Sequence, residues 1–407
     1  MGWKSKLDRF VAESPPKPAS PAPQPLDELR AKMARLLGQE VAPQPAPARV
    51  DLLDFAEEDT PFGPLYVRRR RTEVSARIGR AELRPALDAA SEMLALLALD
   101  PRLASCDPRC ALYLDTETTG LVGGAGTVAF LVGLSFVEEG ELVTEQFLLR
   151  RLGEEAPIVA RLSERIEQAS MLVSFNGKAF DLPLLRTRAV MSRMPALPER
   201  PHLDLVHVAR RLHKRRLGSC SLTSLERAIL GFFRQGDIPS SEIAPRYAHF
   251  LRTGDAEGLR PVVEHNDWDL ASMVALVGLY GEPLESLQVA DWVAVAQTLR
   301  RAGSLERAQE VAEAAILAGG GGEAHRVRGE IAKARGDKAL ALADFARALD
   351  ELDDPSLRLE LAKLYEHYAK EFDAALRLVD QGTGEDHEAL QRRRTRLLEK
   401  RRRARGD

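Results

Sequence analysis

The sequence predicts an α/β protein in which helices flank a mixed sheet, followed by an all-helical region toward the C-terminus. Three observations predict this. Three β-type runs in the middle of the chain are joined by short Gly-rich or Glu-Gly connections. Alternating helical and strand-like segments follow them. From about residue 287 the pattern contains only helices, and it repeats.

The length and composition favour a globular protein of more than one domain. The chain has 407 residues, of which 44% are apolar and 29% charged. No window approaches the roughly 18 uninterrupted apolar residues that a membrane helix needs, and the N-terminus lacks the apolar core of a secretory signal. Three cysteines agree with a reducing compartment. We therefore expect a cytoplasmic protein without a membrane partner.

The net charge of −3 gives the chain as a whole no nucleic-acid signature. Local basic runs nevertheless occur at 68–71 ("RRRR"), 210–216 ("RRLHKRR") and 392–405. Each run alone is more often a solvated face than a binding site. They gain weight only where the chemistry elsewhere points to a polyanion.

The first hundred residues carry no recognisable chemistry. Residues 1–50 are rich in Pro and Ala and predict a flexible arm. Residues 51–108 form an accessory segment, with a short extended piece near 63–70 and an amphipathic helix over 82–99.

The central domain is predicted over 109–283. The runs "CALYL", "VAFLVGLSFV" and "ELVTEQFLLR" are typical of an antiparallel meander. A helix over 157–169, a short buried strand "MLVSF" and a helix after Asp181 follow. A weaker strand around "HLDLV" then leads to helices that continue to about residue 280.

The C-terminal region, 287–390, looks like tetratricopeptide-type helical hairpins. Two segments share a small-residue helix, a Gly turn and a second helix, and their turn glycines, Gly303 and Gly336, are 33 residues apart. A looser third copy follows, and residues 391–407 form a basic tail.

Two acids, Asp115 and Glu117, end the first run of the meander. In a strand they point to the same face, where they would repel each other unless they shared a divalent cation. Mg²⁺ and Mn²⁺ prefer oxygen ligands. Alone, the Asp-x-Glu pattern is a weak signal, because it occurs by chance in many chains.

Three further residues strengthen the signal. Asp181 opens a helix after the strand "MLVSF", and an acid there could simply favour the helix dipole. His265 and Asp269 are four residues apart on a later helix and therefore share a face, although a hydrogen-bonded structural pair would look the same. Together, four carboxylates and a histidine are what two-metal phosphodiester hydrolysis needs.

The motifs "DTETTG", "NGKAFDLPLL" and "HNDWD" resemble those of the DEDD exonucleases, which have a ribonuclease H-like fold. The longer pattern over about 109–280, including "LGSCSLTSLERAILG", closely resembles the YprB-type family of ribonuclease H-like exonucleases. The resemblance implies that Asp115 bridges two metal ions, that Glu117 and Asp269 complete one site, and that Asp181 holds the second.

The resemblance also implies a general base shortly before Asp269. Related subfamilies place a His five residues before the last Asp or a Tyr four before it. Here Glu264 stands at minus five and His265 at minus four, so the chain has histidine chemistry in the tyrosine register. We expect His265 to be the base, since a neutral imidazole near pH 7 suits proton abstraction.

The resemblance implies that the terminal nucleotide packs at Thr118 and Gly120, and that Asn176 helps to fix the second motif. The glycines Gly123, Gly124 and Gly126 predict a hairpin turn and not a phosphate cradle, because no Lys-Ser/Thr follows them. Asp204 is expected to be structural. The run at 210–216 becomes a candidate for contacts to backbone phosphates.

The sequence thus predicts a metal-dependent 3′→5′ exonuclease, with two Mg²⁺ or Mn²⁺ ions, that acts on single-stranded DNA or RNA. The helical repeats would recruit a protein partner. Two alternatives stay open: a non-catalytic nucleic-acid or protein-binding adaptor that works through the repeats, and an endonuclease on the same fold.

Overall fold

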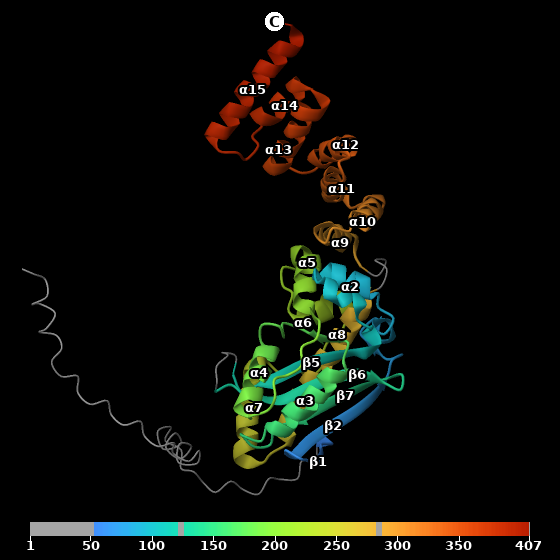
Figure 1. The fold of residues 1–407 in the computed structure, drawn as a ribbon, viewed down its shortest axis with the longest axis vertical. Helices are drawn as coiled ribbons and strands as arrows, with labels where there is room; N and C mark the ends of the chain where they lie inside the picture. Colours follow the sequence, from blue (N-terminus) through green and yellow to red (C-terminus); the bar gives the residue numbers. More distant parts are fainter. Residues whose placement is uncertain (1–52, 121–125, 282–286, 407) are drawn as a thin grey trace, which may run out of the picture. The chain divides into compact units, whose positions relative to one another are not determined.

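The computed structural model describes residues 53–120, 126–281 and 287–406, which lie in one unit, Arg49–Asp407. Its centre is a seven-stranded sheet in the order β1-β2-β7-β6-β5-β8-β9 (Figure 1). The predicted arm, 1–50, and the glycines Gly123 and Gly124 lie outside the described residues. The strands are β1 Ala56–Thr60, β2 Gly63–Glu73, β5 Ala111–Thr118, β6 Ala129–Glu138, β7 Glu141–Leu148, β8 Met171–Ser174 and β9 His202–Asp204.

The sheet is mixed, as predicted. β5, β6 and β7 pair antiparallel as a meander, and β2 and β1 continue the antiparallel pairing at one edge. On the other side of β5, β8 and β9 run parallel to it. The carboxyl ends of β5, β8 and β9 therefore meet at one edge of the sheet, where the chain leaves each strand.

Alternating residues of β5 enter different cores. Ala111 and Tyr113 pack on one face of the sheet, and Leu112 and Leu114 on the other. Helices cover both faces, which explains why the central strands are apolar throughout. One face carries α2 Ser91–Ala98, α5 Leu205–Leu217 and most of α8 Arg260–Gly281; the other carries α3 Ala156–Gln168, α4 Asp181–Met191 and α7 Ser240–Thr253.

The segment before residue 109 extends this sheet. β2 pairs with β7, and the four arginines of residues 68–71 all lie against acids. Arg69 and Arg70 pair with the buried carboxylates of Glu145 and Asp267, at 2.6 and 2.8 Å. This basic run therefore serves the fold.

The single helix predicted over 82–99 is wrong in extent. The chain forms a short 3₁₀ turn, Arg84–Ala86, and then α2. Pro85 has no amide hydrogen and therefore sits in the first turn of the 3₁₀ segment. The amide of Ala90 donates to the carbonyl of Gly281 at the end of α8 and is not available to a continuous helix.

The C-terminal region is all-helical, as predicted. Its successive helices pack against each other as antiparallel pairs. Within these pairs the chain turns at Gly303, Gly336 and Lys370, each of which has a positive φ. The last helix buries Leu397 completely. The helices are α9 Val289–Arg301, α10 Leu305–Leu317, α11 Gly321–Arg335, α12 Lys338–Leu349, α13 Pro355–Leu364, α14 Phe372–Asp380 and α15 His387–Arg405.

Within the described ranges, no helix combines the length and the apolar character needed to cross a membrane.

Candidate active site

The end of β5 and one turn of α8 bring the predicted acids together. Asp115 and Glu117 share the face of β5 that packs on α8. α8 presents His265 and Asp269 one turn apart. Asp181 is the first residue of α4, which follows the neighbouring strand β8. Three elements that are distant in sequence, β5, α4 and α8, thus supply one site.

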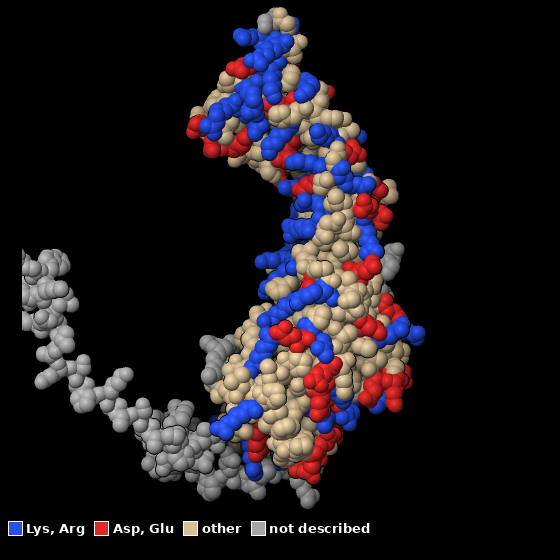
Figure 2. All heavy atoms as spheres, in the orientation of Figure 1, with Lys and Arg blue, Asp and Glu red and all other residues tan. Residues whose placement is uncertain are grey.

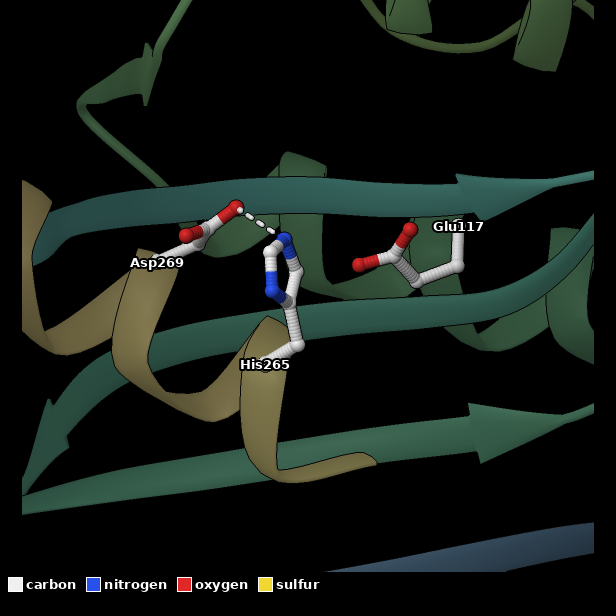
Figure 3. Close-up of side chains that lie close together, drawn as sticks. All are labelled: Glu117, His265 and Asp269. Carbon is white, nitrogen blue, oxygen red and sulfur yellow. Dashed lines mark ion pairs between the residues drawn. The ribbon is translucent and has the colours of Figure 1, made fainter. Parts of the chain in front are cut away.

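Three of these side chains form a compact set of possible metal ligands (Figure 3). One ligand atom each from Glu117, His265 and Asp269 lies within 4.8 Å of the others. The imidazole of His265 stands between the two carboxylates, and its Nε2 is 3.7 Å from Oδ2 of Asp269. This compact set therefore contains two of the four predicted acids, Glu117 and Asp269, together with His265.

Asp115 and Asp181 are each held by a polar neighbour beside this set. The amide of Asn266 donates a hydrogen bond of 2.8 Å to Oδ2 of Asp115. The hydroxyl of Thr116 donates to Oδ1 of Asp181. Both acids lie within the electrostatic field of Asp269. They belong to the same site, although their ligand atoms are not part of the compact set.

Burial and mutual repulsion keep these acids partly neutral. Burial raises the pKa of Glu117 to about 8, with Asp269 and Asp181 contributing. Burial also raises the pKa of Asp181 to about 6 and that of Asp115 well above its ordinary value, where Asp269 and Glu117 add repulsion. None of these three acids has an ion pair with Lys or Arg in the described parts of the chain. A divalent cation would remove the repulsion.

The histidine is oriented by an acid from a loop. Nδ1 of His265 is 2.6 Å from Oδ1 of Asp237 and 3.2 Å from Nη1 of Arg234. The shorter contact assigns the Nδ1 proton to Asp237, which leaves Nε2 facing the carboxylates. Burial lowers the pKa of His265, but Asp269, Glu117 and the bond to Asp237 raise it more, so the net shift is upward.

Sequence reasoning missed Arg234, whose side chain is only 4% exposed. Its guanidinium bonds the carboxylates of Glu226, at 2.5 Å, and Asp269. Burial lowers the pKa of Arg234, but the charges and hydrogen bonds of Asp269 and Glu226 outweigh it, so the net shift is upward. Arg234 thus holds Oδ1 of Asp269, while His265 faces Oδ2. No motif marks its segment, "GFFRQGDIP", so the sequence held no signal for it.

Asp115 is positioned by a chain of hydrogen bonds that starts on β2. Arg68 donates to Gln146, at 2.7 Å, and Gln146 donates to Asn266, at 2.8 Å. Asn266 is fully buried and approaches Gly133 of β6 so closely that a Cβ there would lie 2.1 Å from its Oδ1. Asn266 follows His265 directly in "HNDWD", which was the one available signal for it.

The predicted substrate residues flank the site. The hydroxyl of Thr118 donates to the carbonyl of Gly120, at 2.9 Å. Asn176 has a positive φ of 70°, and its amide donates to Asp204, at 2.7 Å. The buried carboxylate of Asp204 also accepts from the amides of Lys178 and Val206. Asp204 is therefore structural, as expected, because it caps α5 and holds the second motif.

The donor set fits a divalent cation. Carboxylate oxygens with one imidazole nitrogen suit Mn²⁺ and, through the oxygens, Mg²⁺. Asp115, Glu117 and Asp181 have no cationic side chain paired with them among the described residues. Arg234 pairs with Glu226 and Asp269 instead, so a bound cation would supply the missing positive charge.

Comparison with known proteins agrees with this geometry. A family model described as the RNase_H superfamily matches residues 112–280. A Bacillus subtilis (strain 168) protein, described as "Uncharacterized protein YprB", is 39% identical over 166 residues. That match covers 40% of this chain and 40% of the relative, so the chain spans about two fifths of the relative's length. RNase H-like nucleases use divalent metals. Residues 112–280 are thus similar to the RNase H superfamily.

Proposed function

We propose that this protein is a 3′→5′ exonuclease that hydrolyses the phosphodiester bonds of single-stranded DNA or RNA with two Mg²⁺ or Mn²⁺ ions. One observation carries the proposal. Asp115, Glu117 and Asp181 are brought from β5 and α4 to one buried place beside Asp269, with no Lys or Arg paired to the first three in the described ranges. A fold gains nothing from such a cluster unless cations occupy it.

The side chains divide the work between them. Asp115, Glu117 and Asp269 would hold one ion and Asp115 and Asp181 the other, in keeping with the family resemblance. When bound, such ions lower the pKa of a water ligand and neutralise the charge that develops on the phosphate. Arg234 and Asn266 fix the orientation of Asp269 and Asp115.

His265 is proposed as the general base. Its Nε2 faces the carboxylates, and Asp237 holds the proton on Nδ1. In that tautomer Nε2 can accept the proton of the attacking water. Glu264, at the position that related subfamilies give to His, is exposed to solvent, which argues against it as the general base. The geometry thus supports the histidine in the tyrosine register.

The test uses strands labelled at either end, incubated with Mg²⁺ or Mn²⁺. Mononucleotides released from the 3′ end, with loss of the activity in Asp115→Asn, support the proposal. Internal cuts would replace the exonuclease with an endonuclease on the same fold. If neither DNA nor RNA is cleaved in the presence of metal, the proposal of an enzyme is wrong, and an adaptor that works through the helical region is favoured.

The helical region is proposed to recruit a protein partner through tetratricopeptide-like hairpins. Support comes from the helix pairs and from the spacing of their left-handed turn residues, Gly303 and Gly336. We keep the division into 109–283, 287–390 and 391–407 as part of this proposal.

A further inference from the structure

A polar pocket opens beside the candidate active site, between the end of β8 and α5. Its volume is about 530 Å³, and it is lined by basic, neutral polar and apolar side chains but by no acid. The residues that matter below are Phe175, Asn176, Arg210, Lys214, Ser219 and Ser221.

The basic run 210–216 divides into two groups in the structure. Arg211 donates to the carbonyl of Leu97, Arg215 pairs with Glu323, and Arg216 pairs with Asp291 at 2.6 Å. These three arginines serve packing between α5 and its neighbours.

Arg210 and Lys214 form the other group. Both are exposed, both line the pocket, and neither makes an ion pair with any residue that the structure describes. They are one helical turn apart, so their Cβ atoms lie roughly 5–6 Å from each other. Both act on the thiol of Cys220 in the pocket wall: burial raises its pKa, and the two cations oppose that increase. The two charges thus face one common space.

Neutral donors complete the lining. Gly218, with φ of 69°, turns the chain after α5 and places Ser219 and Ser221 at the pocket. The backbone amide of Asn176 is taken by Asp204, but its side-chain amide has no hydrogen-bond partner among the described residues. Figure 2 shows Lys and Arg side chains gathered over the part of the surface where Figure 1 places α5 and α6 (Leu222–Leu225).

The pocket lies at the same edge of the sheet as the acids. β5 and β8 are parallel neighbours with Tyr113 opposite Val173. Continuing this register places Phe175 level with Asp115, one strand spacing of about 4.8 Å away. A strand whose 3′-terminal bond lies at the acids therefore has a short path from the end of β5, across the end of β8, to α5.

We propose that this pocket binds the sugar-phosphate backbone of the substrate strand on the 5′ side of the scissile bond, with Arg210 and Lys214 contacting phosphates. The charge complementarity is direct, because two unpaired cations and several neutral donors face a space without carboxylates. Contacts of this kind are sequence-independent and sensitive to salt. The inference rests on the proposed function, since it takes the strand's end to be at the acids.

The test measures binding of a labelled 12-nucleotide single strand, in Mg²⁺, by proteins that all carry Asp115→Asn to prevent hydrolysis. Adding Arg210→Gln and Lys214→Gln should weaken binding about 10-fold and lower the slope of log K against log salt by about 1–2. The matched control is Arg402→Gln with Arg403→Gln, which removes the same charge from exposed positions on α15 without ion pairs in the described chain. It should change binding less than about twofold. Equal effects of the two pairs would overturn the proposal.

Two further arms separate the possible failures. Arg210→Lys with Lys214→Arg should retain most of the affinity, which excludes loss of folding as the cause. Inorganic phosphate could raise the melting temperature in a way that Arg210→Gln and Lys214→Gln abolish, while strand affinity stays the same. That result would identify free phosphate as the ligand of the pocket and overturn the proposal. Charge-dependent binding without any metal-dependent cleavage would remove the exonuclease but leave the strand site. Metal-dependent cleavage by the protein that retains Asp115, together with unaltered strand binding after Arg210→Gln and Lys214→Gln, would remove the strand site alone.

Discussion

Glu366 in the helical region and Glu117 at the end of β5 are both buried carboxylates, and their surroundings are opposite. Burial raises the pKa of Glu366, but hydrogen bonds from Arg396 and Lys400 outweigh it and bring the value to about 2. Burial raises the pKa of Glu117 to about 8, and nearby acids add to the increase. One carboxylate is neutralised by its own chain and the other is not.

The contrast extends to other pairs of acids. Glu145 is completely buried in the sheet, yet Arg69 and Arg165 bond it at 2.6 and 2.7 Å. Asp115, on β5 and two strands away in the sheet, receives only the neutral amide of Asn266. The chain has many arginines and pairs them with its structural acids. Asp115, Glu117 and Asp181, which it leaves without such partners, are among the acids that we assign to metal ions.

Replacing Asp115 by Asn tests the difference between the paired and the unpaired acids, and we expect it to have the largest effect. We expect nuclease activity to fall by about 10³-fold or more, because loss of a ligand removes several kcal/mol of transition-state stabilisation. The metal-free protein should become more stable by about 1 kcal/mol, since a buried acid that resists ionisation is removed. Steady-state kinetics and urea unfolding check the two parts. A less stable variant would show that Asp115 is structural.

His265→Ala should slow hydrolysis by about 10²-fold, within the range for loss of a general base. The compact set also makes His265 a possible ligand, so Mn²⁺ affinity is measured in parallel by calorimetry. A rate that stays low at saturating Mn²⁺ supports the base. Full recovery of the rate with excess Mn²⁺ would assign His265 to metal binding and remove it as the base.

Glu366→Gln is the matched change on the paired side of the contrast. An amide cannot neutralise Arg396 and Lys400, and we expect a loss of about 2 kcal/mol, below the range for a fully buried pair because both partners are partly exposed. Urea unfolding measures it. Nuclease activity per folded molecule should not change; a large loss would mean that the helical region takes part in catalysis.

The pH dependence of stability gives the smallest effect. Glu117 and Asp181 have raised pKa values of about 8 and about 6, so the folded state holds more protons than the unfolded state between about pH 4.5 and 8. The raised pKa of His265 acts in the same direction. Stability of the metal-free protein should therefore fall by about 1–2 kcal/mol as pH rises through this window.

Urea midpoints at fixed ionic strength, with chelator present, measure this trend. Glu117→Gln should flatten it, whereas Glu366→Gln should not, because the pKa of Glu366 lies below the window. A midpoint that rises from pH 5 to pH 8 would contradict the unpaired state of the site.

The sequence predicted the parts of the site that regular structure delivers. Alternation in β5 placed Asp115 and Glu117 on one face, and the four-residue spacing on α8 placed His265 beside Asp269. Arg234 and Asp237 could not be predicted, because they lie in a connection whose path depends on the packing of α7 and α8. Their role exists only once distant segments meet.

The basic runs show the same limit in the fold. Residues 68–71 and 210–216 look alike as sequence, since neither reveals which arginines will find acids. Arg69 and Arg70 pair with Glu145 of β7 and Asp267 of α8, which lie 76 and 197 positions further along the chain. Charge patterns therefore predict exposure poorly when the partner is set by strand pairing.

The absence of a side chain at Gly133 links the stability of β6 to the candidate active site. A glycine in the middle of a central strand weakens the strand by roughly 0.5–1 kcal/mol relative to alanine. Here the missing methyl group leaves the space that Asn266 occupies on its way to Asp115. Strand propensity favours a larger residue at position 133, but its Cβ would lie 2.1 Å from Oδ1 of Asn266 and would displace the amide that holds Asp115. At this position strand propensity and the support of the first acid are therefore opposing design goals.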